Sequence, residues 1–180
     1  WFGVAAETPA EEIASPELAQ RTVERVEEFR RGGESAELAL GQAEVASVIR
    51  YAAPGVLPEG IGAPEVRIED GRVHLATRVA LGAVPPVPEL ESVLGILPDT
   101  VPVQVDGSLM PFGEDEAALV VHRVRASGIP LPRRLIPRLL EAFGRTDRTG
   151  LPPDAMILPL PGGLRSAYIH SDSLILVAAR

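Results

Sequence analysis

The sequence predicts an α+β fold in which a curved antiparallel sheet of three hairpins wraps on amphipathic helices. Three observations lead to this prediction: a turn dipeptide with alternating apolar residues on both sides, two further pairs of strand-like runs, and a proline-framed segment with helical apolar spacing. Of the 180 residues, 46% are apolar but only 4% are aromatic. The chain is therefore long enough for a domain with an aliphatic core.

The first hairpin is the clearest element, with predicted strands over 66–69 and 72–75 joined by Asp70-Gly71. This dipeptide suits a two-residue turn because both residues tolerate a positive φ. In that register the apolar residues pair across the strands and share one side of the sheet: Ile68 with Val73, and Val66 with Leu75.

Two further hairpins are predicted later in the chain. A loop over 113–116 joins the strand that begins at 101–105 to a returning strand over 118–125. The resulting register has one opposite-charge pair and two apolar pairs: Asp106 with Arg123, Val105 with Val124, and Leu109 with Val120. The third hairpin joins 164–170 to 173–177, with Ile169 opposite Leu174 and Ala167 opposite Leu176.

Two helices are predicted before the first hairpin. One begins at Ser15, which can cap it, and ends at Gly32-Gly33. Because its apolar stripe is thin, we expect a surface helix that flanks the domain. The stripe consists of Leu18, Thr22, Val26 and Phe29. The other follows Gly41-Gln42 and stops at Pro54-Gly55, at the start of a loop over 54–64. A brief helical run is also predicted over 89–97.

An amphipathic segment framed by prolines spans 128–143. Its apolar residues recur at helical spacing on one face and its arginines take the other. The apolar set is Leu135, Ile136, Leu139, Leu140 and Phe143, and the basic set is Arg133, Arg134 and Arg138. Pro137 would break a longer helix, so the regular part is expected over 137–143.

We expect two regions along the chain: an anchor-proximal segment with the surface helix over 1–34, and a single α+β domain over 35–180. Trp1-Phe2, followed by small apolar residues and an acidic stretch, is typical of the outer margin of a signal peptide or membrane anchor. The pattern predicts a periplasmic or extracytoplasmic protein, tethered to the membrane through a segment preceding Trp1.

The formal net charge of −8 argues against general nucleic-acid binding, which requires a basic surface. The charge is uneven, since residues 51–120 hold eleven acids and three Arg, whereas residues 121–180 hold four acids and nine Arg. The basic region favours contact with anionic headgroups or an acidic partner surface. A merely solvated polar face is the alternative.

The sequence has no catalytic or metal-binding motif. His74, His122 and His170 fall on different predicted strands without metal-ligand spacing, His122 is expected opposite Gly107, and Cys is absent. No nucleophile elbow, phosphate loop or dinucleotide fingerprint occurs. We therefore expect a protein that is not an enzyme and needs no cofactor or metal.

The order of these patterns resembles that of bacterial envelope lipid-binding proteins of the LmeA-like and YpmS-like type. The resemblance spans residues 37–178 and rests on three motifs: V-x-I-x-D-G-x-V-x-L at 66–75, P-V-x-V-x-G-x-L at 102–109, and G-I-P-L-P at 128–132. It implies a tubular lipid-binding architecture, in which an antiparallel sheet is rolled partly around a helix and leaves an apolar groove.

Carried onto this chain, the resemblance implies an apolar groove formed by Val73, Leu75, Val105, Leu109, Val120, Leu139, Leu140 and Phe143. Independently of the resemblance, the basic segment predicts that Arg133, Arg134 or Arg138 contacts a phosphate or headgroup. The alternative is that the same apolar residues form a closed core.

Two functions follow from these alternatives. The first is a non-catalytic extracytoplasmic lipid-binding domain, whose partner is a lipid or membrane surface and which holds an acyl chain between sheet and helix. The second is a structural or accessory extrinsic subunit of a membrane protein complex. An apolar void of roughly a few hundred Å³ between helix and sheet would favour the first function, and a filled interior the second.

Overall fold

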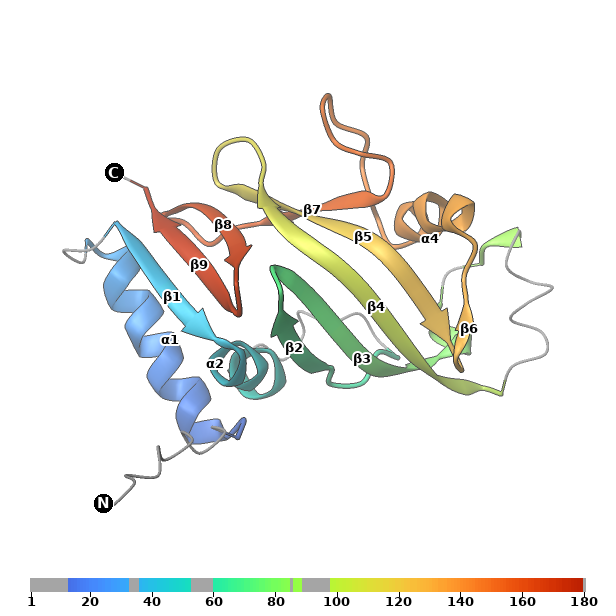
Figure 1. Ribbon diagram of the computed structural model, residues 1–180, viewed down its shortest axis with the longest axis horizontal. Coiled ribbons are helices and arrows are strands. Elements are labelled where there is room, and N and C mark those ends of the chain that lie inside the picture. The colour runs from blue at the N-terminus through green and yellow to red at the C-terminus, as the bar shows by residue number, and fades with distance from the viewer. Residues whose placement is uncertain (1–12, 33–35, 53–59, 85, 89–97, 180) are drawn as a thin grey trace, which may run out of the picture.

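The computed structural model describes residues 13–32, 36–52, 60–84, 86–88 and 98–179 (Figure 1). They form an α+β fold of mostly antiparallel sheet with a few short helices, as the sequence predicts. The start of the chain, the helical run expected over 89–97 and most of the loop over 54–64 lie outside the described residues. So does the predicted boundary between residues 34 and 35.

A six-stranded antiparallel sheet forms the larger part of the molecule. Its order is β2-β3-β4-β5-β6, and β7 pairs with the remaining part of β5. The strands are β2 (Glu65–Glu69), β3 (Arg72–Ala80), β4 (Thr100–Pro111), β5 (Glu116–Ala126), β6 (Ile129–Pro130) and β7 (Ala155–Pro159).

The register of the first hairpin is confirmed, with Ile68 opposite Val73 and Val66 opposite Leu75. Its turn residue Asp70 has the positive φ of 52° that the two-residue turn requires.

In the second hairpin, Asp106 opposite Arg123 and Val105 opposite Val124 are also confirmed. Beyond them the register shifts at Gly107, so Leu109 lies opposite Leu119 and the expected pairing with Val120 is wrong. The cause is a β-bulge, in which β5 contains one extra residue.

The third hairpin belongs to a separate three-stranded sheet, which differs from the single sheet expected. Its order is β1-β9-β8, with β1 (Glu37–Gly41), β8 (Leu164–His170) and β9 (Ser173–Ala178). The predicted pairs of this hairpin are confirmed, Ile169 with Leu174 and Ala167 with Leu176. The local pattern predicts the hairpin, but it carries no information on β1 as the second neighbour of β9.

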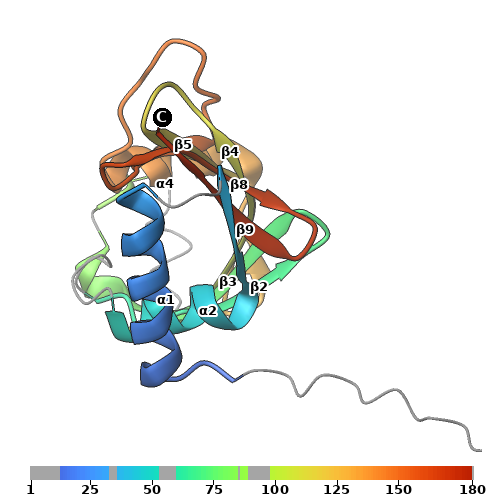
Figure 2. The ribbon, with the colours of Figure 1, turned by 90° about the vertical axis from the view of Figure 1, so that its left-hand side faces the viewer.

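Helix α1 (Pro16–Arg30) packs on the three-stranded sheet instead of flanking the domain (Figure 2). The Ser15 hydroxyl accepts a hydrogen bond from the Leu18 amide at 3.1 Å and caps the helix as predicted. Phe29 is buried in one cluster with Leu40 of β1 and Leu176 of β9. The thin apolar stripe predicted for this helix therefore faces the core.

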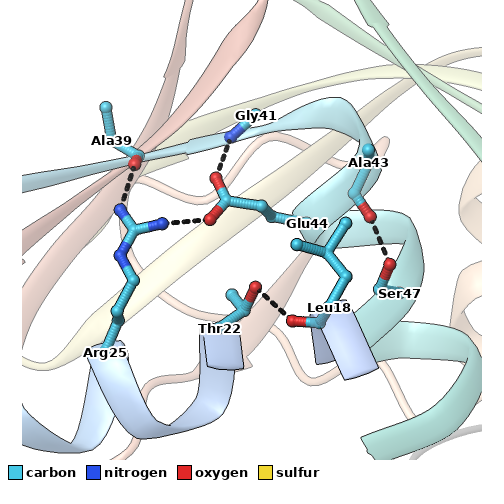
Figure 3. Close-up of polar contacts among 8 residues, drawn as sticks. All are labelled: Leu18, Thr22, Arg25, Ala39, Gly41, Ala43, Glu44 and Ser47. Atoms are coloured by element: carbon cyan, nitrogen blue, oxygen red, sulfur yellow. Dashed lines mark hydrogen bonds and ion pairs between the residues drawn. The ribbon is translucent and has the colours of Figure 1, made fainter. Parts of the chain in front are cut away.

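Polar contacts join α1 to β1 and to α2 (Gln42–Ser47), which continues as the π-helical turn η1 (Val48–Ala52) (Figure 3). Glu44 accepts a hydrogen bond from the Gly41 amide at 2.9 Å and forms an ion pair with Arg25. Ser47 is fully buried, where its hydroxyl donates to the Ala43 carbonyl and accepts from the Ser15 amide. These contacts fix the angle between the two helices.

The two sheets contact each other where β8 lies against β4 and β5, and also at two of their turns. The Gly71 amide of the β2–β3 turn donates to the Ser171 carbonyl of the β8–β9 turn at 2.9 Å. The neighbouring Asp70 amide donates to the Asp172 carboxylate at 3.3 Å. Both turns are thereby held in place by a partner hairpin far away in the sequence.

Helix α4 (Ile136–Ala142) follows a short 3₁₀ turn over Arg133–Leu135, and Pro137 lies in its first turn. The predicted shortening by Pro137 is therefore confirmed. The helix packs against β5, because Ile136 and Leu140 are buried in one cluster with Val121 and Val124.

We expect Ile136→Ala to lower the free energy of unfolding by about 2 to 5 kcal/mol, because Ile136 is only 1% exposed and the lost atoms leave a cavity. Ile129→Ala is the matched control, since Ile129 is 43% exposed, and should change the value by less than about 0.5 kcal/mol. Urea unfolding followed by circular dichroism measures both. Equal losses in the two variants would contradict the packing of α4.

Tyr168 of β8 provides a test of the three-stranded sheet. Desolvation of the half-buried ring, together with the hydrogen bond from its hydroxyl to Glu37 of β1 at 3.1 Å, raises the pKa of Tyr168. Because the neutral phenol is favoured in the fold, this stabilisation is complete below the ordinary tyrosine pKa of 10.0 and is lost as the pH rises through the raised pKa.

In a Tyr51→Phe background, which leaves Tyr168 as the remaining tyrosine of the chain, Glu37→Gln should lower the pKa of Tyr168. Spectrophotometric titration of the tyrosinate absorbance measures the change. An unchanged curve would show that β1 does not reach β8 across β9.

Candidate functional site

The six-stranded sheet has one apolar and one polar face. Residues directly opposite each other in antiparallel strands lie on the same side, so the confirmed register assigns each side chain to a face. One row on the apolar face runs across four strands: Val66, Leu75, Val105 and Val124. The adjacent row on the polar face also crosses four strands: Arg67, His74, Asp106 and Arg123.

The apolar face is closed at both sides by helices. At one side α4 covers Val121 and Val124 of β5. At the other side β2 packs on α2, and Val66 and Ile68 are buried. Between these regions lie four aliphatic residues that are only half-buried, which we call the aliphatic strip: Val73, Leu75, Val105 and Leu109.

The eight predicted groove residues therefore do not form one surface. Leu140 is buried in the α4 cluster, and Leu139 and Val105 pack against it, while Leu109 packs against the cluster under α1. Phe143 is half-buried just beyond α4 and belongs to no cluster within the described residues. Four of the eight residues remain together as the aliphatic strip.

Val120 lies on the opposite side of the sheet from Val105. It is opposite Ser108 and packs against Ala118, Leu151 and Ala155. The bulge explains this placement, because the extra residue in β5 reverses the alternation that the sequence implies for Val120 and Val124.

The three predicted headgroup arginines are on the exposed surface of α4 and the turn before it. Arg138 forms an ion pair with Glu141 at 3.1 Å. Within the described part of the chain, Arg133 and Arg134 have no ion pair. These two guanidinium groups are therefore available to an anion from outside the chain.

The polar row borders a wide cleft of about 530 Å³. A smaller cleft of about 240 Å³ lies between α2 and β2, and Gln42, Glu65 and Val66 line both clefts. The wide cleft lies over β2, β3 and β4. At its floor His74 Nδ1 is 2.7 Å from the Asp106 carboxylate, and Arg123 is 4.0 Å from the other oxygen of that carboxylate. The sequence analysis assigns no role to His74. The signal that could have identified it is the strand register, which places His74 opposite Arg67 on one side and Asp106 on the other.

The bulge brings a second polar pair together on this face. Ser108 Oγ is 2.9 Å from His122 Nε2, and both side chains are half-buried. His122 was expected opposite Gly107, but Gly107 pairs with Val121 and His122 is the extra residue. Close packing at Gly107 fixes this arrangement, since an added Cβ would meet the Val120 carbonyl oxygen at 2.7 Å.

Neither pair forms a metal site. Among the described residues, no three His, Asp or Glu side chains come together in an arrangement that could hold a metal ion. In the same part of the chain, no helix is both long and apolar enough to cross a bilayer.

No protein-family model, curated protein or solved structure matches the chain. The resemblance to envelope lipid-binding proteins thus stays a prediction.

We expect Gly107→Ala to destabilise the fold by about 1 to 3 kcal/mol, because the new methyl group would collide with backbone at the bulge. Gly82→Ala is the control, since a Cβ at Gly82 meets no atom within 4 Å. Urea unfolding measures the loss, and the imidazole signals in NMR spectra report whether His122 keeps its environment. A stable Gly107→Ala variant with unchanged His122 signals would contradict the bulge.

Proposed function

We propose that the chain is a non-catalytic lipid-binding domain that holds an alkyl chain along the aliphatic strip of the six-stranded sheet. The proposal includes the finer form of the predicted fold, a curved sheet that wraps on α2 and α4 with the strip on its concave side. One observation carries it: all four strip residues keep exposed surface, with Val105 at the border of the α4 cluster, Leu109 at the border of the cluster under α1, and Val73 and Leu75 outside both.

The energetics favour an alkyl ligand over a polar one. Half-buried aliphatic side chains gain free energy from any apolar cover, and each enclosed CH₂ group contributes about 0.8 kcal/mol. The ligand would lie on β3 and β4 and not under α4, because Ile136 and Leu140 already fill that space.

Arg133 and Arg134 support a lipid as the source of the alkyl chain. Both are exposed and free of ion pairs in the described residues, and they precede the helix that borders the strip. A phosphate or an anionic bilayer surface would bind them by charge-assisted hydrogen bonds. An extracytoplasmic location with a membrane tether belongs to the same proposal.

A second candidate function, an accessory extrinsic subunit of a membrane protein complex, is supported by the filled space under α4. Ile136 is 1% exposed and Leu140 6%, so this helix lines no open groove. Its exposed arginines would then contact an acidic surface of a partner protein.

Native mass spectrometry after gentle extraction tests the two functions. A lipid-binding domain should carry, or take up from liposomes, a ligand of lipid mass. Val73→Gln should weaken uptake of a fluorescent fatty acid by about tenfold or more, because an amide in the strip loses its hydration without a partner. Ile129→Gln, an exposed apolar residue outside the strip, is the matched control.

Thermal melting of both variants shows whether they remain folded. A clean apo mass without uptake from liposomes would refute the lipid-binding function and leave the accessory role. Equal uptake by the wild type and a folded Val73→Gln variant would refute the assignment to the strip.

A further inference from the structure

The wide cleft on the polar face has a lining that differs in kind from the aliphatic strip. Seven of its residues, from α2 and from three strands, are charged or amide-bearing: Gln42, Glu65, Arg67, Glu69, His74, Gln104 and Asp106. Val66, Leu75 and Ala76 complete the lining. A concave surface with several convergent polar groups is the usual form of a small-molecule site.

His74 is held in a fixed orientation at the floor of this cleft. Its Nδ1 is 2.7 Å from Asp106, whose second oxygen faces Arg123. In the residues that the structure describes, His74 Nε2 has no hydrogen-bond partner, and 38% of the side chain is exposed. The Asp106 carboxylate accepts the proton of Nδ1–H and so fixes the tautomer, which leaves Nε2 as an acceptor for an N–H group of a ligand.

Three charged residues of β2 form a row along the cleft, which we call the β2 charge row: Glu65, Arg67 and Glu69. They occupy alternate positions of the strand and therefore share a face. All three are exposed, and none has an ion pair within the described ranges. Arg67 lies directly opposite His74, so the guanidinium and the fixed imidazole border the same space.

Gln42 adds an oriented amide at the edge of the cleft. Its Oε1 accepts a hydrogen bond from the Ile68 amide at 3.1 Å, so the group left for a ligand is the NH₂. The cleft thus offers donors at Arg67 and Gln42, and acceptors at His74 Nε2 and at both ends of the β2 charge row.

We propose that this cleft binds a small zwitterion, with a carboxylate or phosphate on Arg67 and the Gln42 NH₂ group, and an ammonium group on His74 Nε2 and Glu65 or Glu69. A purely anionic ligand would be repelled by the two glutamates, and a purely cationic one by Arg67. Alternate residues of a strand are about 7 Å apart, and flexible side chains converge over that span onto the neighbouring charges of one small molecule.

Two sources share this chemistry, a free amino acid and the phosphoethanolamine headgroup of a lipid. Leu75 of the aliphatic strip also lines the cleft. The contacts proposed for the zwitterion use polar side chains alone, so the inference does not depend on the proposed alkyl ligand. Water-soluble probes without an alkyl chain therefore test the cleft alone.

Isothermal titration calorimetry of the intact chain with phosphoethanolamine and with glycine tests the inference, against inorganic phosphate, ethanolamine, acetate and methylamine as single-charge probes. At least one zwitterion should bind about tenfold more tightly than each of its two halves. Tighter binding of glycine would point to an amino acid, and tighter binding of phosphoethanolamine to a headgroup.

Arg67→Gln and Glu69→Gln should each weaken binding of that zwitterion by about tenfold, while Arg78→Gln, on β3 outside the cleft, should leave it unchanged. Thermal melting confirms that each variant is folded. Three results would overturn the inference. They are a single-charge probe that binds as tightly as the zwitterion, equal binding by the folded Arg67→Gln variant, and no binding of either zwitterion.

Discussion

The antiparallel pairing of β3, β4 and β5 determines most properties of this molecule, because it fixes the face on which every side chain of the larger sheet lies. A slip by one residue would move Val105 to the polar face and Asp106 to the apolar one. The cost of burying that carboxylate without partners makes the register strongly specified. Both the aliphatic strip and the cleft therefore depend on the same set of hydrogen bonds.

The bulge modifies this constraint at one position, with consequences on both faces. It keeps Val121 and Val124 together under α4, although they are three residues apart in a strand. On the other face it places His122 beside Ser108. Without the extra residue, regular alternation would place the core residue Val121 opposite Ser108. One extra residue thus separates the helix-covered part of β5 from the part that packs against β7.

Local patterns in the sequence predict the hairpins well, because turn chemistry and period-two alternation act between neighbours. Asp70-Gly71 sets one register, and the opposite charges of Asp106 and Arg123 support another. The bulge was missed because alternation alone does not reveal an extra residue. The available signal was Gly107, since a glycine inside a strand often marks a bulge or a close backbone approach. The burial of α1 depends on the pairing of β1 with β9, two strands that are far apart in the sequence. A local stretch of sequence therefore does not predict this burial.

The pairing of β1 with β9 also bears on how the chain reaches its fold. Glu37 pairs with Val177, so the smaller sheet joins the beginning of the described chain to its end. During synthesis β1 and α1 leave the ribosome long before their partner strand exists, and Phe29 and Leu40 stay without cover in that interval. Such non-local pairing slows folding and exposes apolar surface to aggregation. The smaller sheet is thus completed only after β9 has been synthesised, whereas the hairpins of the larger sheet can form as they emerge.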